Sequence, residues 1–402
     1  MRDVLIIGGG FAGLSAAVVA ADENDKAGGD LCITLVNPVD GITIRPRLYE
    51  CDPGTLRPAL RPTLDPAGVV FVESAAEKID TTAKTVTLAT GEALFYDTLI
   101  LATGSEMPLL AVPGFAGHAF NIDTLEAAVA LDEHLSATVS GPEEPGRDSY
   151  VIVGGGMTGI ELATEMPRRI AAHGGADAVG RSRIVLVERA AEVGPGLGVN
   201  PRPIIADALL RAGVEMRLGR SVASVDADGA TLDDGERIAA KTVVTTVGLR
   251  ANALTAQIPG ERDSQGRLCV DDYQRVKGVD AVYATGDVAH ALADDGSADG
   301  GAEQIALMSC QHARTMGKYA GFNAARAMLG LPPQIYRQAD YVTCLDLGDY
   351  GAVFTAGWRR EVQATGHEAK KIKTMINTQL IYPPRGTREE VFAAMRINER
   401  GR

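Results

Sequence analysis

The chain carries the same short pattern twice, and this repetition constrains its fold more than any other feature. In the first copy, an apolar run at residues 4–7 leads into Gly-Gly-Gly-Phe-Ala-Gly at residues 8–13, and a helix-forming stretch follows. The second copy has its apolar run at 150–153 and reads Gly-Gly-Gly-Met-Thr-Gly at 154–159. A buried strand, a G-x-G-x-x-G turn and a helix together open a βαβ unit that binds a dinucleotide. Two copies in one chain predict two dinucleotides, one a bound redox carrier and the other diffusible.

Each glycine of the pattern has its own task. The first permits a tight turn, the second lets the backbone approach a pyrophosphate, and the third lets the helix pack closely on the strand. The N-terminus of the helix adds unpaired N–H groups and the positive end of its dipole. The cofactor-binding residues expected in the two turns are Gly8, Gly10, Ala12, Gly13, Gly154, Gly156, Thr158 and Gly159.

The residue that ends the second strand of each unit is expected to hold a ribose. In the second unit it is Glu188, whose carboxylate would accept a hydrogen bond from a 2′-hydroxyl and repel a 2′-phosphate. This favours NADH over NADPH, although Arg189 directly after it would soften the preference. In the first unit the position holds Asn37, which either binds a hydroxyl without charge or only turns the chain. The Gly/Ala-rich stretch 173–180 predicts a surface loop before Glu188.

Two further strands end in motifs of their own. Residues 96–105 end in Ala-Thr-Gly-Ser, and residues 282–287 end in Ala-Thr-Gly-Asp. With the two glycine turns in this order, the chain resembles the FAD-dependent pyridine-nucleotide oxidoreductases with two dinucleotide-binding domains. The resemblance implies FAD at the first turn and NADH at the second, with Asp287 binding the ribityl chain of FAD. The other cofactor-binding residues that it implies are Ala76, Thr103, Gly104, Gly286 and Gly248.

The resemblance also implies the fold. We expect an α/β protein with two Rossmann-like three-layer domains of the glutathione-reductase type and a small C-terminal segment. The expected FAD domain spans residues 1–113 and 264–330, the NAD(P)H domain spans 114–263, and the C-terminal segment spans 331–402. Helices are predicted at 125–139 and at 310–327, the second with Ser309 as its N-cap. Short strands are predicted near 341–345 and 352–356.

Within that family, the chain is similar to the type II NADH dehydrogenases, which pass electrons from NADH through FAD to quinones. That subgroup carries two glutamines on the helix near the flavin. Gln311 matches the first, whereas Thr315 replaces the second. The resemblance also places Glu161 beside the nicotinamide. The catalytic candidates are therefore Glu161, Gln311 and Thr315, with a quinone-like small molecule as the acceptor.

Cysteine and charge patterns limit the alternatives. The five cysteines form no C-x-x-C pair, so neither a metal site nor a disulfide framework is expected. Two alternatives stay open: a reductase of a ferredoxin- or rubredoxin-type carrier protein, and a sulfide- or persulfide-linked flavoprotein that uses Cys51, Cys310 or Cys344. A flavoprotein that only senses NADH is a third. The formal net charge of −13 argues against a nucleic acid partner.

The sequence favours a cytoplasmic protein. It has no apolar run long enough to cross a bilayer. An apolar patch at Val391, Phe392 and Met395 is too short for an interfacial helix, and the lysines at 370–373 are interpreted as a solvated face. At most weak peripheral contact with the inner face of the membrane is expected, and a homodimer stays open.

Overall fold

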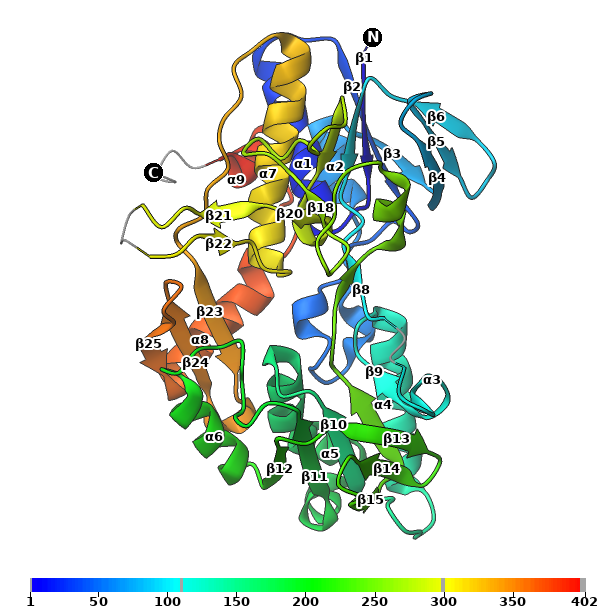
Figure 1. Ribbon diagram of the computed structural model, residues 1–402, viewed down its shortest axis with the longest axis vertical. Helices are drawn as coiled ribbons and strands as arrows, with labels where there is room; N and C mark the ends of the chain where they lie inside the picture. Colours follow the sequence, from blue (N-terminus) through cyan, green and yellow to red (C-terminus); the bar gives the residue numbers. More distant parts are fainter. Residues whose placement is uncertain (1, 109–110, 298–300, 398–402) are drawn as a thin grey trace.

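The computed structural model of the protein describes residues 2–108, 111–297 and 301–397. Its upper half in Figure 1 is built on a parallel sheet with strand order β19-β7-β1-β2-β3. The strands of this first sheet are β1 (Arg2–Ile7), β2 (Leu31–Asn37), β3 (Val70–Glu73), β7 (Thr98–Leu101) and β19 (Val282–Ala284). Residues 4–7 are buried because the sheet is covered on both faces, which explains their continuous apolar run.

A second parallel sheet with order β12-β11-β10-β16-β9 forms the lower half (Figure 1). Its strands are β9 (Phe120–Asn121), β10 (Ser149–Val153), β11 (Arg183–Glu188), β12 (Val214–Leu218) and β16 (Thr242–Thr245). The two sheets therefore repeat one arrangement, with β1 and β10 central and each followed by a glycine turn. The first sheet draws its strands only from 1–113 and 264–330, and the second only from 114–263.

Helix α1 (Phe11–Lys26) follows the first turn and packs against α7 (Cys310–Leu329). The two helices approach closely because small residues of α1 face glycines of α7. A Cβ at Gly317 would lie 2.2 Å from the Ala12 carbonyl oxygen, and one at Gly321 would lie 2.1 Å from that of Ala16. Ser309 caps α7, since its hydroxyl accepts a hydrogen bond from the His312 N–H at 3.3 Å. The predicted cap of this helix is confirmed.

Helix α5 (Met157–Arg181) follows the second turn and lies against α4 (Leu125–Ser140). The surface loop predicted at 173–180 is wrong, because this stretch is helical apart from a kink at Gly175 (φ 66°, ψ −168°). The reason is tertiary packing: a Cβ at Gly174 would lie 2.3 Å from Cγ1 of Val139 on α4. Here Gly174 allows the close contact with α4, and Gly175 forms the kink between two helical runs.

Smaller elements surround the two sheets. Two of them are three-stranded antiparallel sheets: β4 (Ala76–Asp80), β5 (Thr85–Leu88) and β6 (Ala93–Phe95), and β13 (Val222–Asp226), β14 (Gly229–Leu232) and β15 (Arg237–Ala239). The two-stranded pairs are β8 (Ser105–Glu106) with β17 (Arg250–Ala251), β18 (Leu268–Cys269) with β20 (Ala289–His290), and β21 (Leu292–Asp294) with β22 (Gln304–Ile305). The remaining short helices before residue 330 are α2 (Arg61–Ala67), α3 (Phe115–His118) and α6 (Arg202–Arg211).

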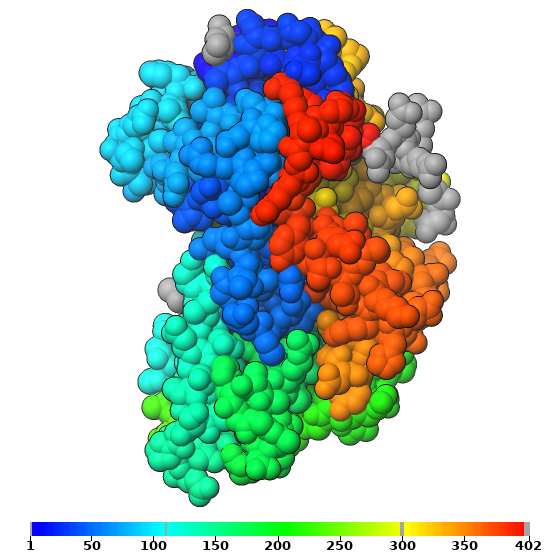
Figure 2. All heavy atoms as spheres, turned by 180° about the vertical axis from the view of Figure 1, so that it is seen from behind, coloured from blue at the N-terminus to red at the C-terminus, as the bar shows by residue number. Residues whose placement is uncertain are grey.

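The C-terminal segment has more structure than the sequence predicted. Strands β23 (Val342–Asp346) and β24 (Ala352–Ala356) were expected, whereas β25 (Glu361–Thr365) and the helical stretches after it were not. Those stretches are α8 (Gly366–Met375), the π-helical turn η6 (Ile376–Leu380) and α9 (Arg388–Met395). Seen from behind, this segment runs down one side of the molecule and lies beside both halves (Figure 2).

The apolar patch of α9 packs inward against α1. Val391, Phe392 and Met395 are buried, and Met395 Sδ lies 3.9 Å from the Ser15 hydroxyl. Arg396 pairs with Asp22 of α1 at 2.9 Å. The C-terminal segment is thus part of the core. Among the described residues, no helix is both long and apolar enough to cross a membrane.

Candidate active site

The two glycine turns have nearly the same geometry. Gly8 has a φ of 104° and Gly154 a φ of 110°, values that side-chain-bearing residues rarely adopt. The third glycine of each turn sits against the first. A Cβ at Gly13 would lie 1.7 Å from the Gly8 carbonyl oxygen, and one at Gly159 would lie 1.8 Å from that of Gly154. Both turns therefore require glycine for the close packing of helix on strand.

The middle position behaves differently, because it faces open space. A Cβ at Gly10 or at Gly156 would meet no atom within 4 Å. Both residues are exposed, and each is the N-cap of its helix without a side chain that caps it. The first N–H groups of α1 and α5 are therefore available to an anion. This geometry fits one pyrophosphate at each turn.

The two strand-end residues occupy equivalent positions in the two units. Asn37 Oδ1 accepts a hydrogen bond from the Gly9 N–H at 2.7 Å, and Glu188 Oε2 accepts one from the Gly155 N–H at 2.6 Å. Glu188 Oε1 also accepts one from the Ala190 N–H at 2.7 Å. Each carboxylate oxygen keeps a second lone pair for a ribose hydroxyl. Asn37 is thus more than a turn residue, because it holds the first glycine turn as Glu188 holds the second.

Asp287 is held in a buried polar cluster beside the first turn. Its Oδ2 accepts a hydrogen bond from the Ser105 hydroxyl at 2.6 Å, and Arg45 Nη1 lies 3.8 Å from the same oxygen. Burial raises the pKa of this carboxyl. The Thr103 and Thr285 hydroxyls nearby in sequence are buried without a partner in the described part of the chain. A polyhydroxylated chain such as the ribityl group of FAD would give such groups partners.

The other predicted cofactor residues lie around the two turns. Gly286 packs against α1, since a Cβ there would lie 2.8 Å from that of Ala12, whereas a Cβ at Gly104 would meet nothing within 4 Å. Thr158 is exposed at the start of α5. Gly248 follows β16 beside Pro108, and Ala76 opens β4 opposite Leu88. Their roles in binding stay predictions.

Glu161 lies on the first turns of α5 and is buried in an ion pair that the sequence did not predict. Its Oε1 accepts hydrogen bonds from Lys373 Nζ at 2.7 Å and from the Asp346 N–H at 3.0 Å. Burial raises the pKa of Glu161. Burial also opposes the charge on Lys373, but the neighbouring Glu161 carboxylate outweighs it and raises the pKa of Lys373. The solvated-face interpretation is therefore wrong for Lys373, because α8 packs that side chain against α5.

The same pair belongs to a network that joins all three parts of the chain. The Tyr49 hydroxyl donates to Asp346 Oδ2 at 3.0 Å, and Lys370 Nζ donates to the other oxygen of Asp346. Asn377 Nδ2 donates to Glu50 Oε1 at 2.8 Å. No short motif marks these residues, since they come from separate elements. One signal could have suggested this network: the spacing of the lysines on residues 366–375 puts Lys373 on an apolar face of a helix.

Gln311 and Thr315 lie one turn apart on α7 and are half-buried. The Thr315 hydroxyl donates to the Gln311 carbonyl oxygen at 3.2 Å, so it is already used within the helix. The Gln311 amide makes no hydrogen bond within the described residues and stays available to a ligand. Of the two, only Gln311 offers a free polar group.

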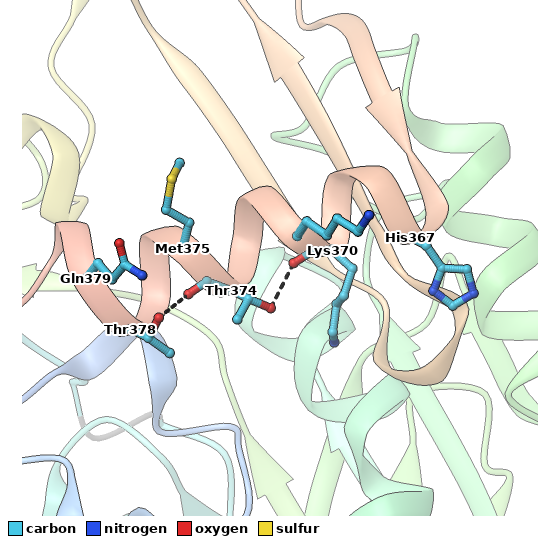
Figure 3. Close-up of a pocket in the computed structure, with 7 residues that line it drawn as sticks. His367, Lys370, Thr374, Met375, Thr378 and Gln379 are labelled. Carbon is cyan, nitrogen blue, oxygen red and sulfur yellow. Dashed lines mark hydrogen bonds between the residues drawn. The ribbon is translucent and has the colours of Figure 1, made fainter.

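A shallow groove of about 520 Å³ runs along α8 and η6 (Figure 3). The Thr374 and Thr378 hydroxyls both donate to backbone oxygens of their own helix, at 2.9 and 2.7 Å. The groups that line this groove are His367, Lys370, Lys371, Thr374, Met375, Thr378 and Gln379. Lys370 links the groove to the buried network through Asp346.

Comparison with known proteins agrees with this geometry. The pyridine nucleotide-disulphide oxidoreductases match residues 2–317, which include both glycine turns. The chain belongs to this family. The family resemblance seen in the sequence is confirmed, and the protein is an oxidoreductase of the FAD- and NAD(H)-dependent type.

Relatives of this oxidoreductase cover nearly its whole length. An NADH dehydrogenase-like protein of Mycobacterium tuberculosis is 45% identical over 399 residues, which are 98% of each chain. A type II NADH:quinone oxidoreductase of Staphylococcus saprophyticus is 25% identical over 402 residues, with 95% of each chain covered. The solved sulfide:quinone oxidoreductase of Aquifex aeolicus has the same fold, with a TM-score of 0.78 and 18% identity over 98% of this chain and 92% of that one.

The cysteines of this oxidoreductase form no pair. All five are free thiols, and each lies in the described part of the chain. Burial raises the pKa of Cys51, of Cys310 and of Cys344, the last to about 11. Cys51 Sγ faces Glu165 Oε1 at 3.8 Å, and Cys344 Sγ faces the Ala369 carbonyl oxygen at 3.7 Å. Thiols held in the protonated form are poor nucleophiles, whereas the fold shared with the sulfide:quinone oxidoreductase fits the sulfide-linked alternative, which stays open.

Proposed function

We propose that this protein transfers hydride from NADH to FAD and then passes the electrons to a quinone-like small molecule. Two equivalent glycine turns carry this proposal, and only the second has a carboxylate, that of Glu188, at the end of the following strand. It supports two dinucleotides with different tasks. The names of the mycobacterial and staphylococcal relatives point to the same reaction. The cytoplasmic location, with at most weak peripheral membrane contact, is part of this proposal.

On the donor side, the chain binds and orients the dinucleotide. The α5 N-terminus at Gly156 binds the pyrophosphate, and Glu188 binds the adenosine ribose, so NADH is preferred to NADPH. FAD held at the first turn would supply the acceptor for the hydride of the nicotinamide. Glu161 Oε1 is used by Lys373 and Asp346, whereas its Oε2 makes no hydrogen bond within the described residues. That oxygen would accept a hydrogen bond from the nicotinamide carboxamide.

On the acceptor side, reduction places negative charge on a carbonyl oxygen and requires protons. The free Gln311 amide can donate a hydrogen bond to such an oxygen. The buried ammonium of Lys373 is a second positive charge, and its pairing with Glu161 holds its proton firmly. The positive charge of Lys373 acts to lower the pKa of the thiol of Cys310, the first residue of α7, although burial raises that pKa more. The acceptor site of this proposal is therefore at the start of α7, beside Gln311.

The proposal predicts that Gln311→Ala slows reoxidation of the reduced flavin by a soluble quinone about tenfold, since one hydrogen bond to a developing charge is lost. Reduction of the flavin by NADH should hardly change. Stopped-flow measurement of the two half-reactions separates these steps. Thr315→Val is the matched control, because that hydroxyl is used within the helix, and it should leave both rates unchanged. Equal quinone reoxidation in Gln311→Ala and the unmodified protein would place the acceptor elsewhere.

A further inference from the structure

A cluster of aromatic and basic side chains joins the start of α7 to the C-terminal sheet. The rings of Tyr341 and Trp358 are stacked with centroids 4.8 Å apart. The His312 ring lies 4.8 Å from Tyr341 and 5.7 Å from Trp358. The Arg360 guanidinium lies over the Tyr341 ring, 4.2 Å from its centroid. We call these four residues the Arg360 cluster.

Three polar groups of the Arg360 cluster are buried and have no hydrogen-bond partner among the residues that the structure describes. They are His312 Nε2, Trp358 Nε1 and Arg360 Nη1. His312 Nδ1 lies 2.9 Å from the Ser309 hydroxyl, and burial lowers the pKa of this histidine to about 4, so the ring is neutral. When Ser309 donates to Nδ1, the Nε2 atom carries the proton. These three groups are then all donors, which suits an anionic oxygen.

Arg360 is the member that most needs an explanation. Its side chain is only 6% exposed, yet within the described residues no carboxylate pairs with it. Its backbone is left-handed with a φ of 56°, which is uncommon for a residue other than glycine. A buried, unpaired guanidinium is costly, and strained backbone is typical of ligand sites. Both observations indicate a partner that is present when the protein works.

The position of Arg360 identifies the region that this partner occupies. The turn 357–360 packs against loop 194–200 of the second domain. A Cβ at Gly198 would lie 3.0 Å from Arg360 Cγ, and Asn200 Nδ2 donates to the Arg359 carbonyl oxygen at 2.9 Å. The same loop is tied to the second glycine turn, because the Gly194 N–H donates to the Gly155 carbonyl oxygen at 2.9 Å. Loop 194–200 therefore connects Arg360 to the second glycine turn, where the NADH site is proposed.

We propose that Arg360 is a further NADH-binding residue, which reaches over from the C-terminal sheet to bind a phosphate oxygen of the dinucleotide. A guanidinium offers two parallel N–H donors to a phosphate, and Trp358 Nε1 adds a third. This inference rests on the proposed function, since it assumes that NADH binds at the second turn. It adds a contact from the C-terminal segment that closes the site from the opposite side.

Calorimetric titration of the FAD-loaded protein with ADP-ribose and with adenosine tests the inference. Arg360→Met should weaken ADP-ribose about tenfold and leave adenosine, which has no phosphate, unchanged. The matched control is Arg359→Met, which removes the same charge from the neighbouring exposed residue and should change neither affinity. Equal ADP-ribose affinity in the two variants would overturn the inference. Failure of the unmodified protein to bind ADP-ribose would instead overturn the proposed NADH site.

Two further readouts exclude a merely structural role. Removal of an unpaired buried charge should keep or raise the urea midpoint of the ligand-free Arg360→Met variant. A clear fall in that midpoint would assign Arg360 a structural task and contradict the inference. Trp358 is the chain's single tryptophan, so its fluorescence reports on this cluster alone. ADP-ribose should change this fluorescence in the unmodified protein and in Arg359→Met, but not in Arg360→Met.

Discussion

At the scale of single residues, the middle and the third glycine of each turn differ in whether the fold has room for a side chain. Gly13 and Gly159 are needed by the fold itself, because any side chain there would overlap the backbone of the same turn. Gly10 and Gly156 have open space before them and are needed only when phosphate is bound. Within one six-residue turn, the third glycine therefore serves folding, and we propose that the middle glycine serves ligand binding.

We therefore predict that Gly10→Ala and Gly156→Ala both fold but fail at different steps. Gly10→Ala should purify without FAD, whereas Gly156→Ala should keep FAD and bind NADH at least tenfold more weakly, since a methyl group displaces the pyrophosphate. Flavin absorbance and NADH titration measure the two effects. Loss of FAD from both variants alike would contradict the assignment of separate sites.

Glu188 is the second residue-scale test. Glu188→Gln keeps an oxygen for the Gly155 N–H, as Asn37 does for Gly9, but removes the negative charge. We expect the ratio of kcat/KM for NADPH to that for NADH to rise about tenfold, because repulsion of the 2′-phosphate is lost. Steady-state kinetics with both nucleotides measure it. An unchanged ratio would show that Arg189 or another cation controls the choice.

At the scale of elements, α8 joins the C-terminal segment to α5 through one buried ion pair. Lys373→Met should lower the free energy of unfolding by about 3–5 kcal/mol, because Glu161 is left as a buried, unpaired carboxylate. Combining it with Glu161→Gln should restore most of that loss. Urea denaturation of the two single variants and the double variant measures the coupling. Additive losses in the double variant would mean that the two side chains do not depend on each other.

Elements that depend on local signals could be predicted from the sequence, whereas those that depend on tertiary contacts could not. The start of α7 at Cys310 could be predicted because Ser309 is a local signal, with its hydroxyl on the His312 N–H. The continuation of α5 through 173–180 could not, since the contact of Gly174 with Val139 is tertiary. Lys373 was missed for the same reason: its burial depends on α5, more than 200 residues earlier in the chain.

At the scale of the whole molecule, the three parts meet at a buried set of ionisable groups. Glu165, one turn beyond Glu161, lies 3.8 Å from the Cys51 thiol and 3.4 Å from Arg168. The charges of Asp346, Lys370 and Glu50 also act on its pKa. Burial raises the pKa of Glu165 from 4.5 to about 7. The folded protein therefore binds a proton more tightly than the unfolded chain does. Its stability should fall as the pH rises from about 4.5 to about 7 and then level off.

We predict that Glu165→Gln removes this component. Relative to the unmodified protein, the variant should gain about 3 kcal/mol of unfolding free energy between pH 4.5 and pH 8, which corresponds to the shift in pKa. Urea unfolding at several pH values measures the difference, in which the other carboxyl groups cancel. A constant difference across that range would mean that Glu165 titrates normally.

The two glycine turns could be predicted from sequence because each is contained in one βαβ unit with glycines at fixed spacing. The positions of Lys373 and Arg360 could not be predicted, because both lie in the C-terminal segment, which folds back onto the earlier parts of the chain (Figure 1). The contribution of the C-terminal segment could therefore not be predicted from the sequence.

Anaerobic titration of the purified protein with NADH tests the central claim, which is that one chain holds FAD at the first turn and accepts hydride from NADH bound at the second. We expect a yellow protein whose flavin is reduced, and its absorbance bleached, by about one equivalent of NADH. Gly156→Ala should need a large excess of NADH for the same bleaching. A folded protein that takes up no FAD, or a bound flavin that NADH leaves oxidised, would contradict the account.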